Sequence, residues 1–534
     1  MTMAKKVAVI GAGASGLCAI KCCLDEGLEP TCFERSSDFG GLWRFKETPD
    51  LNTASIYKSV IINTSKEMLC FSDFPVPDDY AVYMHHSKVM KYFRMYAKHF
   101  GLQKYIQPET NVSSVKTRPD FLTTGQWDVT IKNKKGEQKT DIFDAVLVCT
   151  GHHCDPYLPL HMFPGIEKFK GRYFHSRDYK SSSEYEGKRV MVIGLGNSGG
   201  DLSVEISRIA SQVFLSTRRG AWVISRVCDN GYPTDMSSIS RFSNAISHML
   251  PQSLLCSLLE RKLNKRFNHK NYGLQPRHRT RFREPLWRDE LPNRIISGTV
   301  IIKPNVKEFT ETAAVFEDGT VEENIDVVIF ATGYTFSYPF LQPSIIDVRS
   351  NNTNLYKHVF PPHLEQPTLA FIGLVQPDGA IMSVSEMQSR WATRVFKGLV
   401  KLPSVSSMMA DIVKKKENLA KRYVCTQRHT LQIDYINYMD EIAETFGAKP
   451  KMLELFFRNP RLAWKVFFDS CTAYQYRLTG PGKWSGAEKA IMTQWDRVFK
   501  ATMTRCAEVE KQQKTFPVLL MLIFMALMIA FFVF

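Results

Sequence analysis

The sequence lacks the patterns that mark several large classes of protein. Its 12 cysteines are scattered through 534 residues without the spacing of a metal site. Cys22 and Cys23 are adjacent, whereas a flavin disulfide reductase needs a spaced redox pair. We recognise no catalytic triad, secretory leader, nucleic-acid-binding module or low-complexity segment. These absences argue against a metal site, a disulfide reductase and a nucleic-acid partner, and they predict reduced cysteines in a reducing compartment.

The charge balance is strongly basic, with a formal net charge of +16. Residues 257–288 carry ten lysines and arginines against two glutamates. Such an excess favours an acidic partner, either a phosphorylated cofactor or membrane lipid. A solvated basic face explains the local run equally well.

One long uncharged run is present, the 19 residues Phe516–Phe534. A helix of that length spans about 28 Å, close to the roughly 30 Å hydrocarbon core of a bilayer. Lys511 and Lys514 precede the run. The pattern predicts a C-terminal transmembrane helix that anchors the chain, with the catalytic domains on the cytosolic side. A buried core helix is the weaker alternative, because the run has no polar face.

Two glycine-rich turns follow apolar strands, the first after Lys6–Ile10 and the second after Val190–Ile193. Their glycines are Gly11, Gly13 and Gly16 in the first turn, and Gly194, Gly196 and Gly199 in the second. In such a turn the first glycine permits the bend, the second admits a pyrophosphate and the third lets the helix pack on the strand. One motif is a weak signal. Two motifs about 180 residues apart predict two dinucleotides and electron transfer between them.

The residues after the next strand of each unit predict which dinucleotide binds. In the first unit, strand Pro30–Phe33 delivers Glu34, whose carboxylate suits an unphosphorylated ribose diol and therefore FAD. The segment Gly40-Gly41-Leu42-Trp43 offers a second close backbone approach.

In the second unit, strand Val213–Leu215 ends in Ser216, Thr217 and Arg218, followed by Arg219. Guanidinium groups attract a 2′-phosphate that a carboxylate would repel, so this site predicts NADPH. The helix of this unit is expected to begin at Asn197 and Ser198.

The predicted fold class is α/β, with two Rossmann-like dinucleotide-binding domains, a helical insertion and the C-terminal transmembrane helix. Apolar strands at Asp141–Gly151 and Ile325–Gly333 are expected where the chain passes between the domains. Helices are expected from Phe242 to Leu259, broken at Pro251, and further along the chain at 386–399, 408–422 and 434–446. The expected boundaries are 1–156 for the first part of the FAD domain, 157–335 for the NADPH domain with its insertion at about 237–292, 336–450 for the return to the FAD domain, 451–510 for a C-terminal helical region and 516–534 for the anchor.

The segment from Phe169 to Tyr179, which includes Gly171, His175 and Ser176, resembles the identifying sequence of flavin-containing monooxygenases. Phe330-Ala-Thr-Gly-Tyr334 fits the same family, and the resemblance extends over essentially the whole chain. It is similar to the vertebrate microsomal, N-oxide-forming members. The stretches IINTSKEM and STRRGAW are similar to the isoform 5 branch, while DELP and TQWDR are similar to other branches.

The resemblance implies a mechanism in which NADPH reduces FAD, the reduced flavin binds O₂ as a C4a-hydroperoxide, and one oxygen passes to a soft nitrogen or sulfur atom. It implies small lipophilic substrates, an endoplasmic reticulum location and the possibility of a homo-oligomer. Asn63 matches the family's active-site asparagine, with Thr64 beside it, unless it merely caps a turn. Gln376 begins a stretch expected to line the flavin site. His175 and Ser176 are expected to shape the linker between domains.

Three departures from the family pattern keep other functions open. Residues 287–290 read Trp-Arg-Asp-Glu where Asn-Asp-Glu is expected, and Asp378 and Ser383 replace the usual Leu and Pro. A charge near the flavin favours an uncoupled NADPH oxidase or a catalytically weakened NADPH-binding membrane protein. The isoform 5-like stretches favour Baeyer–Villiger oxygenation of ketones as a further alternative.

Overall fold

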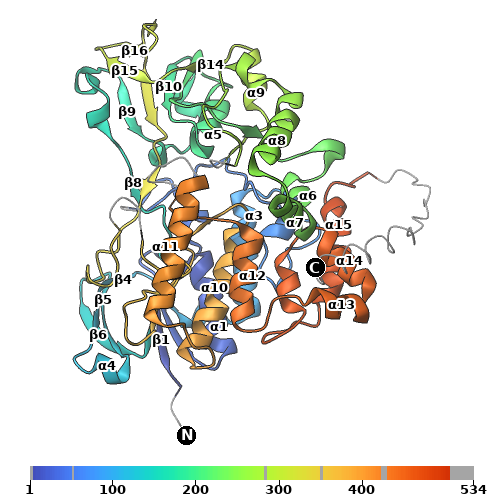
Figure 1. The fold of residues 1–534 in the computed structure, drawn as a ribbon. Helices are drawn as coiled ribbons and strands as arrows, with labels where there is room; N and C mark the ends of the chain where they lie inside the picture. Colours follow the sequence, from blue (N-terminus) through green and yellow to red (C-terminus); the bar gives the residue numbers. More distant parts are fainter. Residues whose placement is uncertain (1–3, 51–52, 282–284, 349–352, 423–429, 506–534) are drawn as a thin grey trace.

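The computed structural model describes residues 4–50, 53–281, 285–348, 353–422 and 430–505 (Figure 1). Two parallel five-stranded sheets organise these residues, each with helices packed against it. In Figure 1 the first sheet lies in the lower part of the molecule and the second in the upper part. The predicted α/β class with two Rossmann-type units is therefore confirmed.

The first sheet has the order β20-β7-β1-β2-β3. Its strands are β1 (Lys6–Ile10), β2 (Glu29–Phe33), β3 (Ile106–Gln107), β7 (Ala145–Val148) and β20 (Leu369–Phe371). Strands buried on both faces read as continuous apolar runs, as β1 and β7 do: α1 (Ala14–Asp25) and α10 (Ile381–Phe396) cover one face of the sheet, and residues of the antiparallel sheet at 110–143 pack on the other. Helix α1 packs against α10, so residues after 368 complete this unit.

The second sheet has the order β14-β11-β10-β18-β9. Its strands are β9 (Arg172–His175), β10 (Arg189–Ile193), β11 (Gln212–Ser216), β14 (Val300–Lys303) and β18 (Val327–Phe330). Helices α5 (Asn197–Ile206) and α9 (Leu291–Ile296) pack together beside it. An antiparallel sheet of β15 (Val306–Phe309), β16 (Ala314–Phe316) and β17 (Val321–Glu322) extends from this unit. The strands and the helix start predicted here are confirmed.

The strand predicted at 141–151 is wrong as a single element. Its first residues belong to β6 (Gln138–Phe143), which pairs with β5 (Trp127–Asn133) in an antiparallel sheet completed by β4 (Thr110–Thr117). The break falls at Asp144, whose carboxylate accepts the N–H of Lys6 at 2.7 Å. Asp144, held by this contact at the start of β1, separates β6, which ends at Phe143, from β7, which begins at Ala145.

The chain crosses between the two sheets at two adjacent places. Strand β8 (Asp155–Pro156) leads out of the first unit, and β19 (Tyr334–Thr335) leads back. The two strands pair antiparallel, so both crossings lie side by side. Short parallel pairs also join β12 (Val223–Ile224) to β13 (Leu286–Trp287), and β21 (Gln376–Pro377) to β22 (Gln432–Ile433).

The predicted helices of the insertion are α7 (Arg241–Met249) and α8 (Gln252–Arg266), separated at Pro251 as expected, with α6 (Thr234–Ser238) before them. The helix expected at 386–399 begins five residues earlier, at Ile381, and ends at Phe396. Its start was missed because polar residues there, Ser383 and Ser385, are buried and interrupt the apolar pattern. The other helices are α2 (Lys66–Leu69), α3 (His86–His99), α4 (Phe121–Thr124), α11 (Val405–Arg422), α12 (Tyr435–Thr445), α13 (Met452–Arg458), α14 (Pro460–Phe468) and α15 (Ala487–Lys500).

The predicted membrane helix at Phe516–Phe534 lies outside the described residues. Across the ranges that are described, we find no helix with the length and apolar character needed to cross a bilayer.

A buried ion cluster fastens the C-terminal region to the first unit. The Arg477 side chain is 2% exposed, and its Nη2 lies 2.7 Å from Glu386 Oε1 on α10 and 3.0 Å from Asp73 Oδ2. Asp73 also pairs with Lys21 of α1 at 2.6 Å. Arg477 Nε donates to Ser72 Oγ at 2.6 Å. The Arg477 guanidinium thus pairs with the buried Glu386 carboxylate and shares the largely buried Asp73 carboxylate with Lys21.

Replacing Arg477 by alanine should lower the free energy of unfolding by roughly 3–5 kcal/mol, because the buried Glu386 carboxylate would lose its guanidinium partner and Asp73 would keep only Lys21. Equilibrium urea unfolding of the purified protein measures the change. Arg172→Ala is the matched control: its pair with Glu184 is about half exposed, and its loss should cost at most about 1 kcal/mol. Similar effects in the two variants would contradict a structural role for the cluster.

Candidate functional site

The first glycine turn joins β1 to α1 in a geometry that only glycine fits. Gly11 has φ +99°, and a Cβ there would lie 2.8 Å from the carbonyl oxygen of Cys149. A Cβ on Gly16 would collide with the carbonyl oxygen of Gly11. The first residue therefore makes the bend, and the third allows α1 to contact the strand end.

The second backbone approach predicted at residues 40–43 lies directly on this turn. The N–H of Gly40 donates to the carbonyl oxygen of Ala12 at 2.9 Å. A Cβ on Gly41 would lie 3.0 Å from Gly13 Cα, so the two glycine segments face each other. Leu42 is 38% exposed, and Trp43 packs partly against the core.

Glu34 stands at the end of β2 with its side chain fixed. Its Oε2 accepts the N–H of Ala12 at 2.8 Å, within the glycine turn. Its Oε1 accepts the N–H of Ser36 at 2.8 Å and the Ser36 hydroxyl at 2.7 Å. Each carboxylate oxygen can accept more than one hydrogen bond, so the group keeps capacity for a ribose diol.

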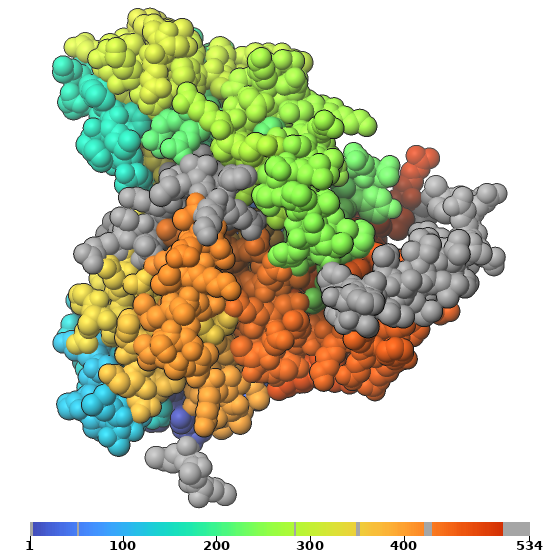
Figure 2. Space-filling view, viewed as in Figure 1, coloured from blue at the N-terminus to red at the C-terminus, as the bar shows by residue number. Residues whose placement is uncertain are grey.

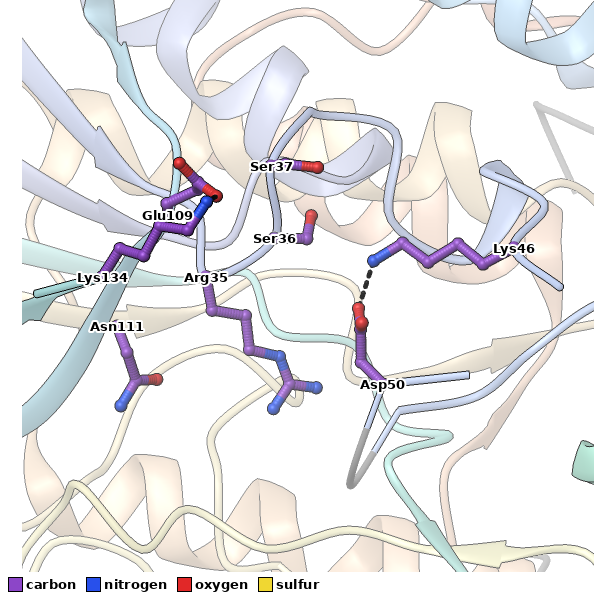
Figure 3. Close-up of a pocket in the computed structure, with 8 residues that line it drawn as sticks. All are labelled: Arg35, Ser36, Ser37, Lys46, Asp50, Glu109, Asn111 and Lys134. Atoms are coloured by element: carbon purple, nitrogen blue, oxygen red, sulfur yellow. Dashed lines mark hydrogen bonds and ion pairs between the residues drawn. The ribbon is translucent and has the colours of Figure 1, made fainter. Parts of the chain in front are cut away.

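A polar cavity of about 450 Å³ lies next to this strand end (Figure 3). Its walls include Arg35 and Ser36 after β2, and Asn111 on β4. Lys46 pairs with Asp50 on one side, and Lys134 pairs with Glu109 at 2.6 Å on the other. The cavity was not predicted, because its walls come from segments that no motif joins.

The second glycine turn repeats the geometry of the first. Gly194 has φ +108°, and a Cβ there would lie 2.5 Å from the carbonyl oxygen of Ala331. A Cβ on Gly199 would collide with the carbonyl oxygen of Gly194. No described atom comes within 4 Å of the Cβ position of Gly196, so this side of the turn is open.

The start of α5 presents the two residues predicted beside that turn. Ser198 is exposed. The Asn197 side chain accepts the N–H of Trp287 at 3.2 Å through Oδ1, which fixes its orientation.

The end of β11 separates the residues predicted to contact a 2′-phosphate. Arg218 and Arg219 are exposed, but Ser216 is buried and its hydroxyl donates to the carbonyl oxygen of Pro304 at 2.7 Å. Thr217 Oγ1 accepts the N–H of Gly220 at 3.2 Å and holds the turn. The single proton of Ser216 is therefore directed away from the surface on which the arginines lie.

Asn63 and Thr64 are half-buried in the loop before α2. Within the described ranges, no hydrogen bond joins the Asn63 amide to another residue, and the residue that precedes α2 as its cap is Ser65. The turn-capping alternative for Asn63 is therefore not what the structure contains. The Ser65 N–H donates to Asp235 Oδ2 at 2.7 Å, across 170 residues of sequence.

Gln376 lies against His152, which the sequence analysis missed. Imidazole Nε2 is 3.3 Å from Gln376 Oε1, and Nδ1 is 3.1 Å from the carbonyl oxygen of Gly373. Burial lowers the pKa of His152, while the contacts with Gln376 and Gly373 act to raise it. Gly373 in turn contacts Ser15 at the start of α1. The stretch from Gln376 thus begins beside the first glycine turn.

Asp378 and Ser383, two of the departures from the family pattern, each make hydrogen bonds with nearby residues. Asp378 is exposed, and its Oδ1 accepts from the Gln432 amide at 2.9 Å. Ser383 is buried, and its hydroxyl lies 3.1 Å from the carbonyl oxygen of Ala380 and 3.2 Å from the Tyr435 hydroxyl. Because water reaches the Asp378 carboxylate, its charge is solvated and not buried.

His175 has a structural environment, as expected. Its Nε2 lies 2.9 Å from the carbonyl oxygen of Gly333, and its Nδ1 accepts the N–H of Arg177 at 3.2 Å. Ser176 is buried. Among the described residues there is no group of side chains able to hold a metal ion, and the ten cysteines are free thiols.

The chain is similar to known proteins over nearly its whole length. The family model for flavin-binding monooxygenase-like proteins matches residues 4–534. Flavin-containing monooxygenase 5 of Cavia porcellus is 62% identical over 504 residues, 94% of each chain. The human protein of that name is 57% identical over 532 residues, 99% of each chain. Dimethylaniline monooxygenase (N-oxide-forming) 2 of Mus musculus is 54% identical over 530 residues, again 99% of each chain.

Solved structures share the fold at lower identity. The S-allyl-L-cysteine S-oxygenase of Allium sativum has a TM-score of 0.64 at 24% identity, covering 93% of this chain and 99% of its own. An open form of cyclohexanone monooxygenase has a TM-score of 0.60 at 17% identity, covering 83% and 98%. With a family model that spans nearly its whole length and relatives above half identity, the chain belongs to the flavin-binding monooxygenase-like family.

Proposed function

We propose that this chain is an NADPH- and O₂-dependent flavin monooxygenase that oxygenates soft nucleophilic nitrogen and sulfur atoms of small lipophilic substrates. One observation carries the proposal. The two units have glycine turns of the same geometry, but the strand that follows in each unit ends in an opposite charge: a buried carboxylate at Glu34 after β2, and exposed guanidinium groups at Arg218 and Arg219 after β11. Nothing in the comparisons favours ketone oxygenation or a loss of catalysis for this chain.

FAD fits the first unit, which we take as residues 1–156 and 336–450. A pyrophosphate needs close approach to the backbone, and the lack of side chains at Gly11, Gly13, Gly16 and the facing Gly40–Gly41 suits that approach. The Glu34 carboxylate is placed for the ribose diol, with the adenosine end directed to the cavity beside Arg35 and Asn111. Leu42, Trp43, Thr64 and Gln376 belong to the same proposed site.

NADPH fits the second unit, residues 157–335. The open face at Gly196 and the start of α5 suit a second pyrophosphate, with Asn197 held in place by Trp287. Arg218 is the main proposed contact for the 2′-phosphate, with Thr217 and Arg219 beside it. Ser216 contributes by holding the strand end through Pro304.

When bound and reduced by NADPH, FAD supplies the electrons that activate O₂ for oxygen transfer. The protein's part is to bind, orient and exclude water, since the chemistry needs no side-chain nucleophile. Asn63 is suited to donate a hydrogen bond in the oxygenation site, because its side-chain amide makes no hydrogen bond to another of the described residues.

The location follows from residues outside the described ranges. We propose that Phe516–Phe534 anchors the enzyme in the endoplasmic reticulum membrane with its catalytic units in the cytosol. Membrane lipid is then a partner, and the basic α8 region is a candidate for further contact with acidic headgroups. A homo-oligomer is compatible with this arrangement.

Arg218→Ala should weaken NADPH far more than NADH, by roughly 1.5–3 kcal/mol if one charge-assisted contact to the 2′-phosphate is lost. The ratio of kcat/KM for the two coenzymes measures this selectivity. Arg172→Ala removes an exposed arginine from the same unit and should leave the ratio unchanged. An equal loss for both coenzymes in Arg218→Ala would assign the residue to structure and not to phosphate recognition.

Asn63→Ala should leave FAD content and anaerobic flavin reduction by NADPH nearly intact, because the glycine turns and Arg218 are untouched. A positioned donor of this kind is worth roughly 2.7–4 kcal/mol by analogy with oxyanion-hole donors. With a tertiary amine or a thioether as substrate, NADPH oxidation should therefore shift from oxide to H₂O₂. Oxide and H₂O₂ per NADPH are the quantities to measure, and an unchanged ratio would remove Asn63 from the mechanism.

Deleting residues 516–534 should release much of the protein from microsomal membranes, since the uncharged run supplies the hydrophobic anchor. Sedimentation after a wash with high salt and alkaline carbonate separates anchored from adsorbed protein. Full retention of the truncated chain under both washes would show that another surface is the main attachment.

A further inference from the structure

The loop that carries Asn63 is tied to the NADPH unit on its N-terminal side. The Tyr57 hydroxyl donates to Oδ2 of Asp201, which lies on α5 two residues after Gly199. Arg288 pairs with Oδ1 of the same carboxylate. Asp201 thus joins the helix at the second glycine turn to the segment that leads into Asn63.

The next turn of the same helix adds a second contact. The Ser59 hydroxyl donates to Oε2 of Glu205, four residues after Asp201. The N–H of Lys58 donates to the carbonyl oxygen of Lys180 at 2.9 Å. Both partners belong to residues 157–335, so this part of the loop lies along the NADPH unit and not only along its own unit.

A third carboxylate holds the loop on the C-terminal side of Asn63. Asp235 of α6 is 4% exposed, and its Oδ2 accepts the N–H of Ser65 at 2.7 Å. Its Oδ1 accepts the N–H of Met236 at 3.0 Å and the Tyr83 hydroxyl at 3.2 Å. Both oxygens of the buried Asp235 carboxylate therefore accept hydrogen bonds.

Asn63 lies between these ties, six residues after Tyr57 and two before Ser65. We propose that Asp201 and Asp235 are positioning residues through which the NADPH unit sets the place of the Asn63 amide during oxygen transfer. This inference rests on the proposed function of Asn63. It assigns to the second unit a role after coenzyme oxidation: the unit that binds NADPH also holds the loop on which oxygenation depends.

Residues 287–290, where the sequence departs from the family pattern, contact both ties. The Trp287 N–H orients Asn197 at the start of α5, and Arg288 orients Asp201 one turn later. Asp289 Oδ2 lies 2.9 Å from Arg226 Nε, and the Arg226 carbonyl oxygen accepts from the Tyr83 hydroxyl at 2.7 Å. The segment therefore supports both ties, one through Asp201 and the other through Tyr83.

Asp235→Asn tests the downstream tie with little change in shape. Asp235 Oδ2 accepts the Ser65 N–H and Oδ1 accepts the Met236 N–H, while the Tyr83 hydroxyl shares its single proton with the Arg226 carbonyl oxygen. The one NH₂ group of asparagine must therefore face a backbone N–H whichever way the amide turns. Hydrogen–deuterium exchange of the FAD-loaded enzyme should show the Ser65 amide exchanging faster, by up to roughly tenfold, because its acceptor becomes at best a neutral amide oxygen in place of a carboxylate. The H₂O₂ formed per NADPH should rise by about threefold or more, with anaerobic flavin reduction by NADPH unchanged.

Tyr57→Phe tests the upstream tie by removing one hydroxyl, and it keeps the test possible if Asp235→Asn fails to fold. It should raise the share of H₂O₂ in the same direction, with faster exchange in peptides covering residues 57–63. Glu184→Gln is the matched control, because it alters an exposed carboxylate of the same unit. It should change neither exchange nor coupling.

The outcomes separate this inference from the proposed function. If Asn63→Ala uncouples the enzyme while Tyr57→Phe and Asp235→Asn remain coupled, Asn63 keeps its role and the positioning inference is wrong. Faster exchange without uncoupling in these two variants also overturns it, since the ties would then be structural only. If Asn63→Ala itself stays coupled, the proposed role of Asn63 fails, and the inference fails with it.

Discussion

The close contact between a helix and the turn that precedes it is the constraint on which both units depend. At Gly16 and at Gly199 a single added methyl group would collide with the carbonyl oxygen five residues earlier. Because neither helix can approach its strand without this glycine, the fold of each unit and its candidate pyrophosphate site arise from one steric condition. Nucleotide binding and chain packing therefore cannot be altered separately at these positions.

Carboxylates that are largely shielded from water have different roles in different parts of the structure. Glu34 is fixed by backbone and hydroxyl donors where a ribose is expected, whereas Glu386 and Asp73 are matched by Arg477 and serve the core. Asp201 and Asp235 join segments that are distant in sequence. Each of these carboxylates is met by hydrogen-bond donors or a cationic partner, and at least one partner of each comes from a distant part of the chain. Such partners are the condition for keeping a carboxylate out of water.

The sequence predicted what repeats locally and missed what depends on distant contacts. The turns at Gly11 and Gly194 and the helices on either side of Pro251 follow from glycine spacing and apolar period, and they were confirmed. The strand at 141–151 was wrong because the contact of Asp144 with Lys6 joins residues 138 positions apart. His152 and Asp235 were missed for the same reason: each is an ordinary residue until the fold brings Gln376 or Ser65 to it.

The order of strands in the first sheet has a consequence for synthesis of the chain. Its edge strand β20 comes from residues 369–371, after all five strands of the second sheet, which end at residue 330. A ribosome therefore delivers a complete second sheet while β7 has β1 on one side and still lacks β20 on the other. About 220 residues separate the end of β7 from the start of β20, so one edge of β7 stays unpaired until residues 369–371 have been synthesised. The first sheet is therefore completed only after the second.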